Sequence, residues 1–329
     1  MERFFTEGKN SPYYQEIKST FFTMEKEFEH ILKSDHRVLT KAATHLLKSG
    51  GKRLRPALVL LGGRLGTQKD SHQMPLALAI ETVHMATLVH DDVVDSAALR
   101  RGKPTVKAKW GNEVSVFTGT YLLAKAMSLM AGYRDSYINH RLSDVAMEMC
   151  RGEIDQMNGA FRIDENIDTY MKRIKQKTAY LLSASCELGA HVSSAPQEIV
   201  AALKNYGEAI GMAFQITDDI LDYRLNNDAF GKVSGGDIRE GIATLPLIYT
   251  LKHTPQKERL LTIFSKRQKS DEEVKEVIRL VSDSGGIEYA ESIAQKHIDK
   301  AKEAAALIPQ PELKEVYHNI ADFILTRNQ

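Results

Sequence analysis

The stretch LVHDDVVDSAALRRGKPT, residues 88–105, places the pattern Asp-Asp-x-x-Asp directly after an apolar run. Residues four apart share one face of an α-helix, so Asp91 lies over Asp95, with Asp92 beside them. Acidic helix faces that are solvated seldom follow such apolar runs. Stacked carboxylates also repel one another unless a cation lies between them. The stretch therefore predicts a largely buried helix whose carboxylates line a cavity.

A second stretch, QITDDILDY at residues 215–223, repeats the pattern after the apolar run AIGMAFQI. Gln215 precedes Asp218 by three residues and Asp222 by seven, so the three share one stripe of a helix. Ligand sets made only of oxygen atoms suit Mg²⁺. Two such motifs in one chain predict a magnesium site built from six carboxylates: Asp91, Asp92, Asp95, Asp218, Asp219 and Asp222.

The overall composition excludes several classes of protein. Lysine and arginine total 44 against 43 aspartate and glutamate, a net charge of +1, so nothing indicates nucleic-acid binding. Two cysteines cannot form a disulfide framework. The polar start MERFFTEGKN predicts no signal peptide, and no apolar run reaches membrane-spanning length. We expect a soluble cytoplasmic protein.

Helical periodicity runs through almost the whole chain, whereas strand alternation is scarcely visible. The sequence contains no internal repeat other than the two acidic motifs. It also shows no low-complexity linker and no break in composition. Asp35 is expected to cap the second helix. The prediction is an all-α fold, a single large helical bundle around a central cavity over residues 1–329. Expected helices cover residues 14–33, 35–48, 56–65, 76–95, 112–131, 137–161, 167–191, 196–225 and 241–253.

Two basic clusters accompany the acidic motifs. The first, at a helix start, comprises Lys52, Arg53 and Arg55. Cations and helix amides together favour phosphate binding there, although the same residues could form a basic surface cluster without a ligand. The second cluster, residues 100–103, follows the first acidic motif directly. Acidic and basic clusters side by side suit a diphosphate clamped between Mg²⁺ and guanidinium groups.

Two further features gain meaning only from their neighbours. His84 lies seven residues before Asp91 on nearly the same helix face, so it faces the expected cavity unless it is a satisfied core histidine. The glycine-rich segment at residues 230–237 contains Lys232 and would close on a phosphate.

Six motifs in this order resemble those of the trans-prenyltransferases, the polyprenyl diphosphate synthases, over residues 50–247. They are GGKRLRP, VHMATLVHDDVVD, RRGKPT, KTAYL, GMAFQITDDILD and GKVSGGDIREGIATLPL. Within that family, VHMATLVHDDVVD followed by RRGKPTVKAKW is similar to the large catalytic component (component II) of the heptaprenyl diphosphate synthases.

The resemblance implies that isopentenyl diphosphate is condensed with an allylic diphosphate, farnesyl diphosphate in the first instance, with Mg²⁺ as cofactor. Asp91, Asp95 and Asp218 would hold the metal, and the other three aspartates would ligate directly or through water. The implied isopentenyl diphosphate site comprises Lys52, Arg55, His84 and Arg101. The implied allylic site comprises Arg100, Lys177, Thr178, Gln215 and Lys232. The implied catalytic set comprises Asp91, Asp92, Asp95, Arg100, Lys177, Gln215 and Asp218.

The chain departs from the family pattern at Thr120, where many members have aspartate, and at Ile242, where many have lysine. The heptaprenyl subgroup also lacks that lysine. Product length is expected to depend on a tunnel floor at Val83, Ala86 and Thr87, the last two lying five and four residues before Asp91. Small residues there leave the tunnel open, which favours a C30–C35 product. Ala86→Phe is expected to shorten it.

The resemblance also implies a second, smaller subunit, or failing that a homodimer, and a product used for the menaquinone side chain. That product would be membrane-seeking. Alternatives are a shorter-chain (geranylgeranyl) synthase and a non-catalytic scaffold subunit, although such subunits typically lose the aspartates. A class I terpene cyclase needs no isopentenyl site. An HD phosphohydrolase, suggested by His90-Asp91, leaves the second motif unexplained.

Overall fold

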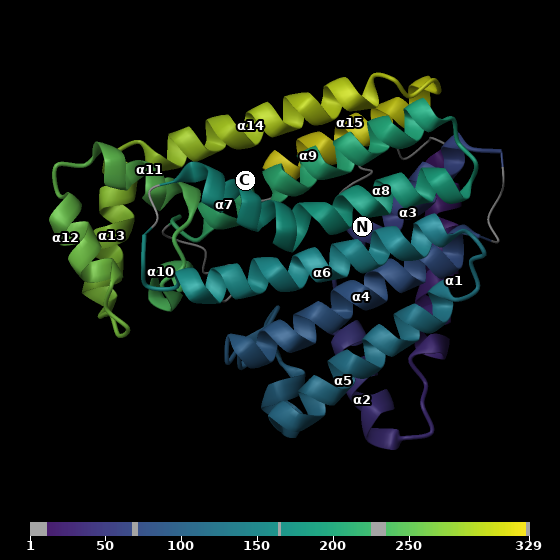
Figure 1. Ribbon diagram of the computed structural model, residues 1–329, viewed down its shortest axis with the longest axis horizontal. Coiled ribbons are helices and arrows are strands. Elements are labelled where there is room, and N and C mark those ends of the chain that lie inside the picture. Colours follow the sequence, from purple (N-terminus) through teal and green to yellow (C-terminus); the bar gives the residue numbers. More distant parts are fainter. Residues whose placement is uncertain (1–11, 68–71, 164–165, 225–234, 327–329) are drawn as a thin grey trace. The chain divides into compact units, whose positions relative to one another are not determined.

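The computed structural model describes residues 12–67, 72–163, 166–224 and 235–326. Helices account for most of this described part, and its one sheet is a short antiparallel hairpin, which confirms the all-α prediction (Figure 1). The elements in chain order are α1 (Pro12–Ile31), α2 (Arg37–Lys48), α3 (Leu54–Gly62), η2 (Gly63–Leu65), α4 (Gln73–Val94), β1 (Leu99–Arg100), β2 (Lys103–Pro104), α5 (Val106–Met130), α6 (Ser136–Gly159), α7 (Ile167–Ile174), η3 (Lys175–Ala179), α8 (Tyr180–Val192), α9 (Gln197–Leu221), α10 (Gly236–Glu240), α11 (Leu245–His253), α12 (Lys257–Phe264), α13 (Asp271–Asp283), α14 (Gly286–Ala305) and α15 (Pro311–Thr326).

The described chain divides into two compact units. The first takes its residues from 1–144, 184–204 and 307–316, and the second from 145–183, 205–306 and 317–329. The first acidic motif and both basic clusters belong to the first unit, and the second acidic motif belongs to the second. A single domain over the whole chain stays a prediction.

The first unit is built on α3, α4 and α5. Every residue from Pro56 to Gly62 is buried, so α3 is apolar on all sides, as expected for a central helix. The helices α4 and α5 run alongside each other (Figure 1). At one crossing a Cβ on Gly119 would lie 2.2 Å from Nε2 of His90, so a larger residue there would require the His90 ring to move. Apolar as α3 and α4 are, no helix within the described ranges combines the length and hydropathy needed to cross a bilayer.

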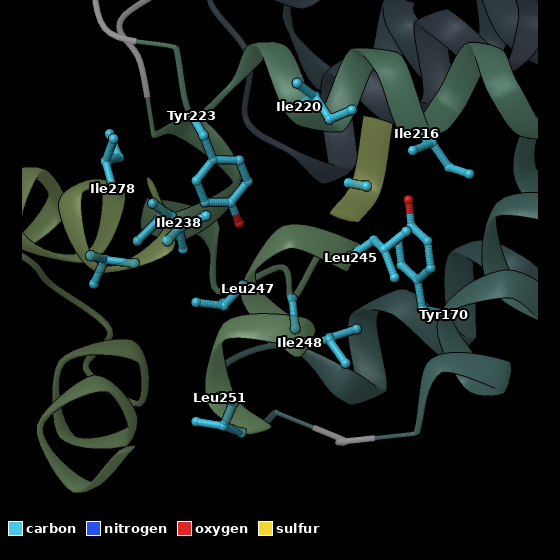
Figure 2. Packing of buried hydrophobic residues seen from close by; sticks show 14 of the residues in the cluster. Tyr170, Ile216, Ile220, Tyr223, Ile238, Leu245, Leu247, Ile248, Leu251 and Ile278 are labelled. Carbon is cyan, nitrogen blue, oxygen red and sulfur yellow. The ribbon is translucent and has the colours of Figure 1, made fainter. Parts of the chain in front are cut away.

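The second unit has its own apolar core. Side chains from α7, α9, α11, α12, α13 and α14 form one buried cluster, part of which is drawn in Figure 2. Burying one large apolar side chain contributes about 1.5–3 kcal/mol, so a cluster of this size holds the helices in register. Two tyrosines, Tyr170 and Tyr223, lie inside the cluster, and each hydroxyl has a polar partner, Asp219 for Tyr170 and Thr244 for Tyr223.

Capping residues in the sequence account for some helix ends but not for others. The Ser270 side chain accepts a hydrogen bond from the Glu273 amide at 3.2 Å, and the Glu273 carboxylate accepts one from the Ser270 amide at 3.0 Å, which forms a capping box for α13. The predicted cap Asp35 is wrong, because His36 occupies the cap position of α2 without a side-chain hydrogen bond. The expected helix at residues 167–191 is interrupted by the π-helical η3.

His297, on α14, makes folding of the second unit sensitive to acid. Burial and the charge of Lys300 lower the pKa of His297 to about 4, whereas a free histidine has about 6.5. The unfolded chain therefore binds the proton first, and stability is lost as pH falls from about 6.5 towards 4. The wild type is expected to lose unfolding free energy between pH 7 and pH 5. We expect His297→Gln to lose about 1 kcal/mol less over this range, a figure that allows for solvent screening of this half-exposed ring.

Urea denaturation of both proteins at pH 7 and pH 5 measures this difference. His140→Gln, at an exposed position, is the matched control. An equal loss of stability in the His297 variant and the wild type would contradict the assignment.

Candidate active site

The first acidic motif occupies the last turn of α4. Asp91 is half-buried, Asp92 is buried and Asp95 is exposed at the C-terminal cap. The negative end of the helix dipole lies at this terminus, where cations are stabilising and carboxylates are not. Three carboxylates placed here create a local need for positive charge.

Arg100, in β1, supplies part of that charge. Its Nε atom donates a hydrogen bond to Oδ1 of Asp92 at 2.8 Å, and the two groups form a salt bridge. Burial raises the pKa of the Asp92 carboxyl, and the charge of Arg100 opposes this effect. The other oxygen, Oδ2 of Asp92, is buried and accepts no hydrogen bond from the described chain. A buried carboxylate oxygen without a donor is costly, and a bound cation would relieve that cost.

The β1–β2 hairpin is fixed to the C-terminal end of α2. Lys103 Nζ donates to the carbonyl oxygen of Lys48 at 2.6 Å, a favourable position for a cation because the last carbonyls of a helix are otherwise unsatisfied. The guanidinium of Arg101 donates to the carbonyl oxygen of Gly50. These contacts hold the second basic cluster beside residues 51–56.

His84, on α4, lies among the same cations. Burial lowers the pKa of His84 well below its ordinary value, and nearby guanidinium charges lower it further: those of Arg55, Arg101, Arg100 and Arg53. The imidazole is therefore neutral at pH 7 and carries one N–H donor. Basic side chains from two distant segments converge here on a neutral donor, an arrangement that suits an anion.

The prediction that Lys52, Arg53 and Arg55 together form an anion site is wrong for Arg53. Its Nε donates to Glu25 and its Nη1 to Glu81, each at 3.0 Å, so two carboxylates neutralise its charge. The residue has a left-handed backbone (φ 52°) at the start of α3, and its side chain is buried. Lys52, which is exposed, and Arg55, which is half-buried, remain as the candidates from this segment.

The predicted tunnel floor lies one turn or more before the first acidic motif. Val83 and Ala86 are buried, and Ala86 has no accessible surface. Thr87 is half-buried, and its hydroxyl donates to the carbonyl oxygen of His84 at 2.9 Å. A phenylalanine at Ala86 would overpack the core, so Thr87 is the better position at which to test product length.

The second acidic motif ends α9 in the same way. Asp218 is exposed, and Asp222 follows the last residue of the helix. Oδ1 of Asp222 accepts a hydrogen bond from the Gly236 amide at 3.0 Å, and Oδ2 accepts one from the Asp237 amide at 2.8 Å. Asp222 therefore fixes the start of α10, and both motifs place carboxylates at the unfavourable end of a helix dipole.

Asp219 is buried at the centre of a hydrogen-bond network. Tyr170 Oη donates to its Oδ2 at 2.7 Å, and Gln215 Nε2 donates to its Oδ1 at 2.8 Å. Thr178 Oγ1 in turn donates to Oε1 of Gln215 at 2.7 Å. Burial raises the pKa of Asp219 to about 6, although the hydrogen bonds from Tyr170 and Gln215 oppose this. The network connects three of the predicted site residues.

Lys177 and Thr178 lie in η3, a π-helical turn of a kind often found at functional sites. Lys177 Nζ contacts Oε1 of Glu153 at 2.8 Å and donates to Oε1 of Gln156 at 2.9 Å. A Cβ on Gly152 would lie 3.0 Å from Cγ of Lys177, so α6 approaches this turn closely. The lysine is thereby held in one direction.

The predicted site residues thus fall into two sets. The first unit carries Lys52, Val83, His84, Arg55, Ala86, Thr87, Asp91, Asp92, Asp95, Arg100 and Arg101, and the second carries Lys177, Thr178, Gln215, Asp218, Asp219 and Asp222. Lys232 lies outside the described residues. Within those described, no three carboxylate, imidazole or thiol groups are grouped so as to hold a metal ion. The individual roles stay predictions.

The sequence pattern of the family described as polyprenyl synthetase matches residues 36–281, more than half of the chain. The chain belongs to the polyprenyl synthetase family. Heptaprenyl diphosphate synthase component 2 of Bacillus subtilis (strain 168) is 38% identical to it over 311 residues, 94% of this chain and 89% of that protein.

Solved structures of the polyprenyl synthetase type show the same fold. The heptaprenyl diphosphate synthase from Staphylococcus aureus has a TM-score of 0.91 and 34% identity, covering 95% of this chain and 99% of its own. A polyprenyl synthase from Caulobacter crescentus CB15, complexed with calcium and isoprenyl diphosphate, has a TM-score of 0.90 and 32% identity, covering 96% and 97%. Family membership supports a prenyltransferase.

The two departures from the polyprenyl synthetase pattern lie in ordinary surroundings. Thr120 is exposed, and its hydroxyl donates to the carbonyl oxygen of Val116 one turn earlier at 3.0 Å. Ile242 is half-buried, and its amide donates to the carbonyl oxygen of Asp237 at 2.8 Å. Neither side chain replaces the charge of the usual residue.

The acidic residues fit Mg²⁺. Their donors are all oxygen atoms, which suit a hard cation. The buried Oδ2 of Asp92 has no hydrogen-bond donor, and both motifs end helices whose dipoles favour positive charge. These observations support a divalent cation in this family member.

Sequence reasoning missed Tyr170, Glu153 and Gln156. Each holds a predicted site residue, Asp219 in the first case and Lys177 in the other two. None of them belongs to a motif, and all reach their partners only through the packing of separate helices. No pattern in the sequence marks them.

Proposed function

We propose that the chain transfers an allylic prenyl group, starting from farnesyl diphosphate, to isopentenyl diphosphate, and repeats this to give a trans polyprenyl diphosphate of C30–C35. The observation that carries the proposal is the convergence of guanidinium groups on neutral His84, in the unit that holds the first acidic motif. A neutral donor among cations suits a diphosphate, and the neighbouring carboxylates suit its metal.

In this proposal, four residues bind isopentenyl diphosphate and orient its double bond: Lys52, Arg55, His84 and Arg101. Arg100 and Lys177 bind the allylic diphosphate, and Lys232 would add charge there. When bound, Mg²⁺ supplies positive charge at the departing diphosphate; Asp91, Asp95 and Asp218 would hold it, with the other three aspartates ligating directly or through water.

The reaction breaks the allylic C–O bond and forms a C–C bond to the terminal carbon of isopentenyl diphosphate. Oxygen atoms of Thr178 and Gln215 present the negative ends of their dipoles to the allylic cation, while Arg100 stabilises the negative charge of the leaving group. The released diphosphate takes the proton lost from the isopentenyl unit, so no side-chain base is required.

We also propose a partner chain, because a relative is named as component 2 of its synthase. Three apolar residues on α6 are more than half exposed and lie on one stripe, which supports a covered surface there: Met147, Ile154 and Met157, at 51%, 55% and 53%. The partner is a smaller subunit or a second copy of this chain. We further propose that the product is used for the menaquinone side chain and that the protein is located in the cytoplasm.

A product assay tests the function. The purified chain is incubated with Mg²⁺, farnesyl diphosphate and labelled isopentenyl diphosphate, and product length is read by chromatography while light scattering gives the assembly mass. C30–C35 product from the chain alone supports an autonomous synthase, and activity only after addition of a small subunit supports the partner. No turnover under either condition would favour the scaffold alternative, and a C20 product the geranylgeranyl one.

The product-length prediction concerns Thr87. Because its side chain is half-buried, whereas those of Val83 and Ala86 are buried, a bulky ring is accommodated there with least overpacking. We expect Thr87→Phe to shorten the product to C20 or less, with the first condensation slowed less than about tenfold.

The control is Leu88→Phe, about 100° around the same helix and also half-buried. It should leave product length unchanged. If Thr87→Phe still makes C30–C35 product, Thr87 is not part of the floor.

A further inference from the structure

Tyr170 combines an apolar environment with one polar contact. Its ring lies in the buried cluster of the second unit, 1% exposed, and its hydroxyl points toward α9 (Figure 2). That hydroxyl donates to Oδ2 of Asp219 at 2.7 Å. The Tyr170 hydroxyl is therefore the donor to this carboxylate oxygen.

The second oxygen of Asp219 determines how the amide of Gln215 is oriented. The Gln215 amide donates from Nε2 to Oδ1 of Asp219, so it presents its NH₂ group to the carboxylate. Its carbonyl oxygen then faces the opposite way and accepts the hydroxyl proton of Thr178. If the carboxylate rotates, this constraint on the amide is lost.

Tyr170 is the contact that prevents such rotation. Within the described residues, the Asp219 side chain accepts two side-chain hydrogen bonds, one on each oxygen, from Tyr170 and from Gln215. Of these two donors, the tyrosine lies outside the acidic motif and is held by the surrounding core. Side chains locked by packing transmit their position to the groups that they hydrogen-bond. Removing the hydroxyl would leave the ring in place and release the carboxylate.

We propose that Tyr170 is a positioning residue for prenyl transfer, which through Asp219 sets the direction of the oxygen dipole that Gln215 presents to the allylic substrate. The inference rests on the proposed function. A dipole aimed at the developing cation lowers the barrier to ionisation more than it strengthens substrate binding. The effect therefore belongs to kcat rather than to KM.

Tyr170→Phe in the full chain tests this. Loss of an interaction that orients a site residue typically costs about 10–100-fold in activity, so we expect kcat to fall by about that factor, with KM for both substrates within about threefold. Tyr206→Phe is the matched control, because that tyrosine is also fully buried and donates its hydroxyl to a backbone carbonyl, that of Tyr317, at 2.7 Å. It should retain wild-type kcat.

A second arm separates positioning from a structural effect. In a Gln215→Ala background Tyr170→Phe should cause no further loss of kcat, because residues that act through one another are not additive. Calorimetric affinity for a non-ionisable allylic thiolodiphosphate should stay within about threefold of wild type. Incorporation of 3-fluorotyrosine at position 170, which keeps ring and hydroxyl, should retain activity and covers the case in which the phenylalanine variant does not fold.

The outcomes are distinguishable. A wild-type chain inactive alone and with its small subunit overturns the proposed function. An active wild type with Tyr170→Phe within twofold of its kcat overturns the role of Tyr170. The role of Tyr170 is also overturned if Tyr170→Phe lowers kcat as much in the Gln215→Ala background as in the wild type. The tyrosine would then be structural only.

Discussion

Asp91→Asn and Asp218→Asn are each expected to lower kcat of prenyl transfer by about 10³-fold, which corresponds to about 4 kcal/mol of transition-state stabilisation. Each substitution keeps the size of the side chain and removes one negative oxygen from a motif that ends a helix. The charge that would hold Mg²⁺ against the departing diphosphate is then incomplete. Initial rates with saturating substrates measure the effect.

The control for both variants is Asp155→Asn. Asp155 is an exposed acid of α6, 3.7 Å from Lys172, and lies outside the proposed site. It should retain activity, and circular dichroism should show that all three variants are folded. If either motif variant kept more than a tenth of the wild-type kcat, its aspartate would not be a ligand of the catalytic metal.

Arg53→Met is expected to destabilise the protein by about 3–5 kcal/mol, the typical cost of leaving a buried charge without its partner. Glu81 is 4% exposed, and its Oε1 receives Nη1 of Arg53 at 3.0 Å. Desolvation lowers the pKa of Arg53, but the two glutamates reverse this and raise it above its ordinary value. Urea denaturation measures the free energy of unfolding.

The double variant Arg53→Met with Glu81→Leu should recover more than half of this loss, because no buried charge is then left uncompensated. Arg259→Met removes the exposed bidentate pair with Glu276 and should change stability far less. A loss no larger than that of Arg259→Met would show that the pair with Glu81 is solvated in solution.

Apolar patterning predicted the helices that carry the chemistry. The expected helix at residues 76–95 is α4, and that at 196–225 is α9, each within a few residues at either end. Both follow long apolar runs, which bury a helix whatever its partner is. The short elements around them, such as the β1–β2 hairpin and α10, depend on a few side-chain contacts and have no periodicity to predict them.

Charge was harder to predict than helicity. Lys52, Arg53 and Arg55 look alike in the sequence, yet Arg53 turns into the core to meet two glutamates that lie 28 residues away in either direction. Such pairings depend on tertiary packing, which no local pattern encodes. The same limit hides Tyr170, whose partner Asp219 is 49 residues away.

The π turn of η3 aligns two side chains that a regular helix would separate. Tyr170 and Thr178 are eight residues apart, which in an α-helix leaves them about 80° out of line. A π turn takes about one residue more than an α turn, so the offset falls to about 20°. Both hydroxyls then reach α9 one turn apart, at Asp219 and Gln215. The extra residue acts as a register shift, and a one-residue deletion there would separate the two contacts while leaving the helix intact.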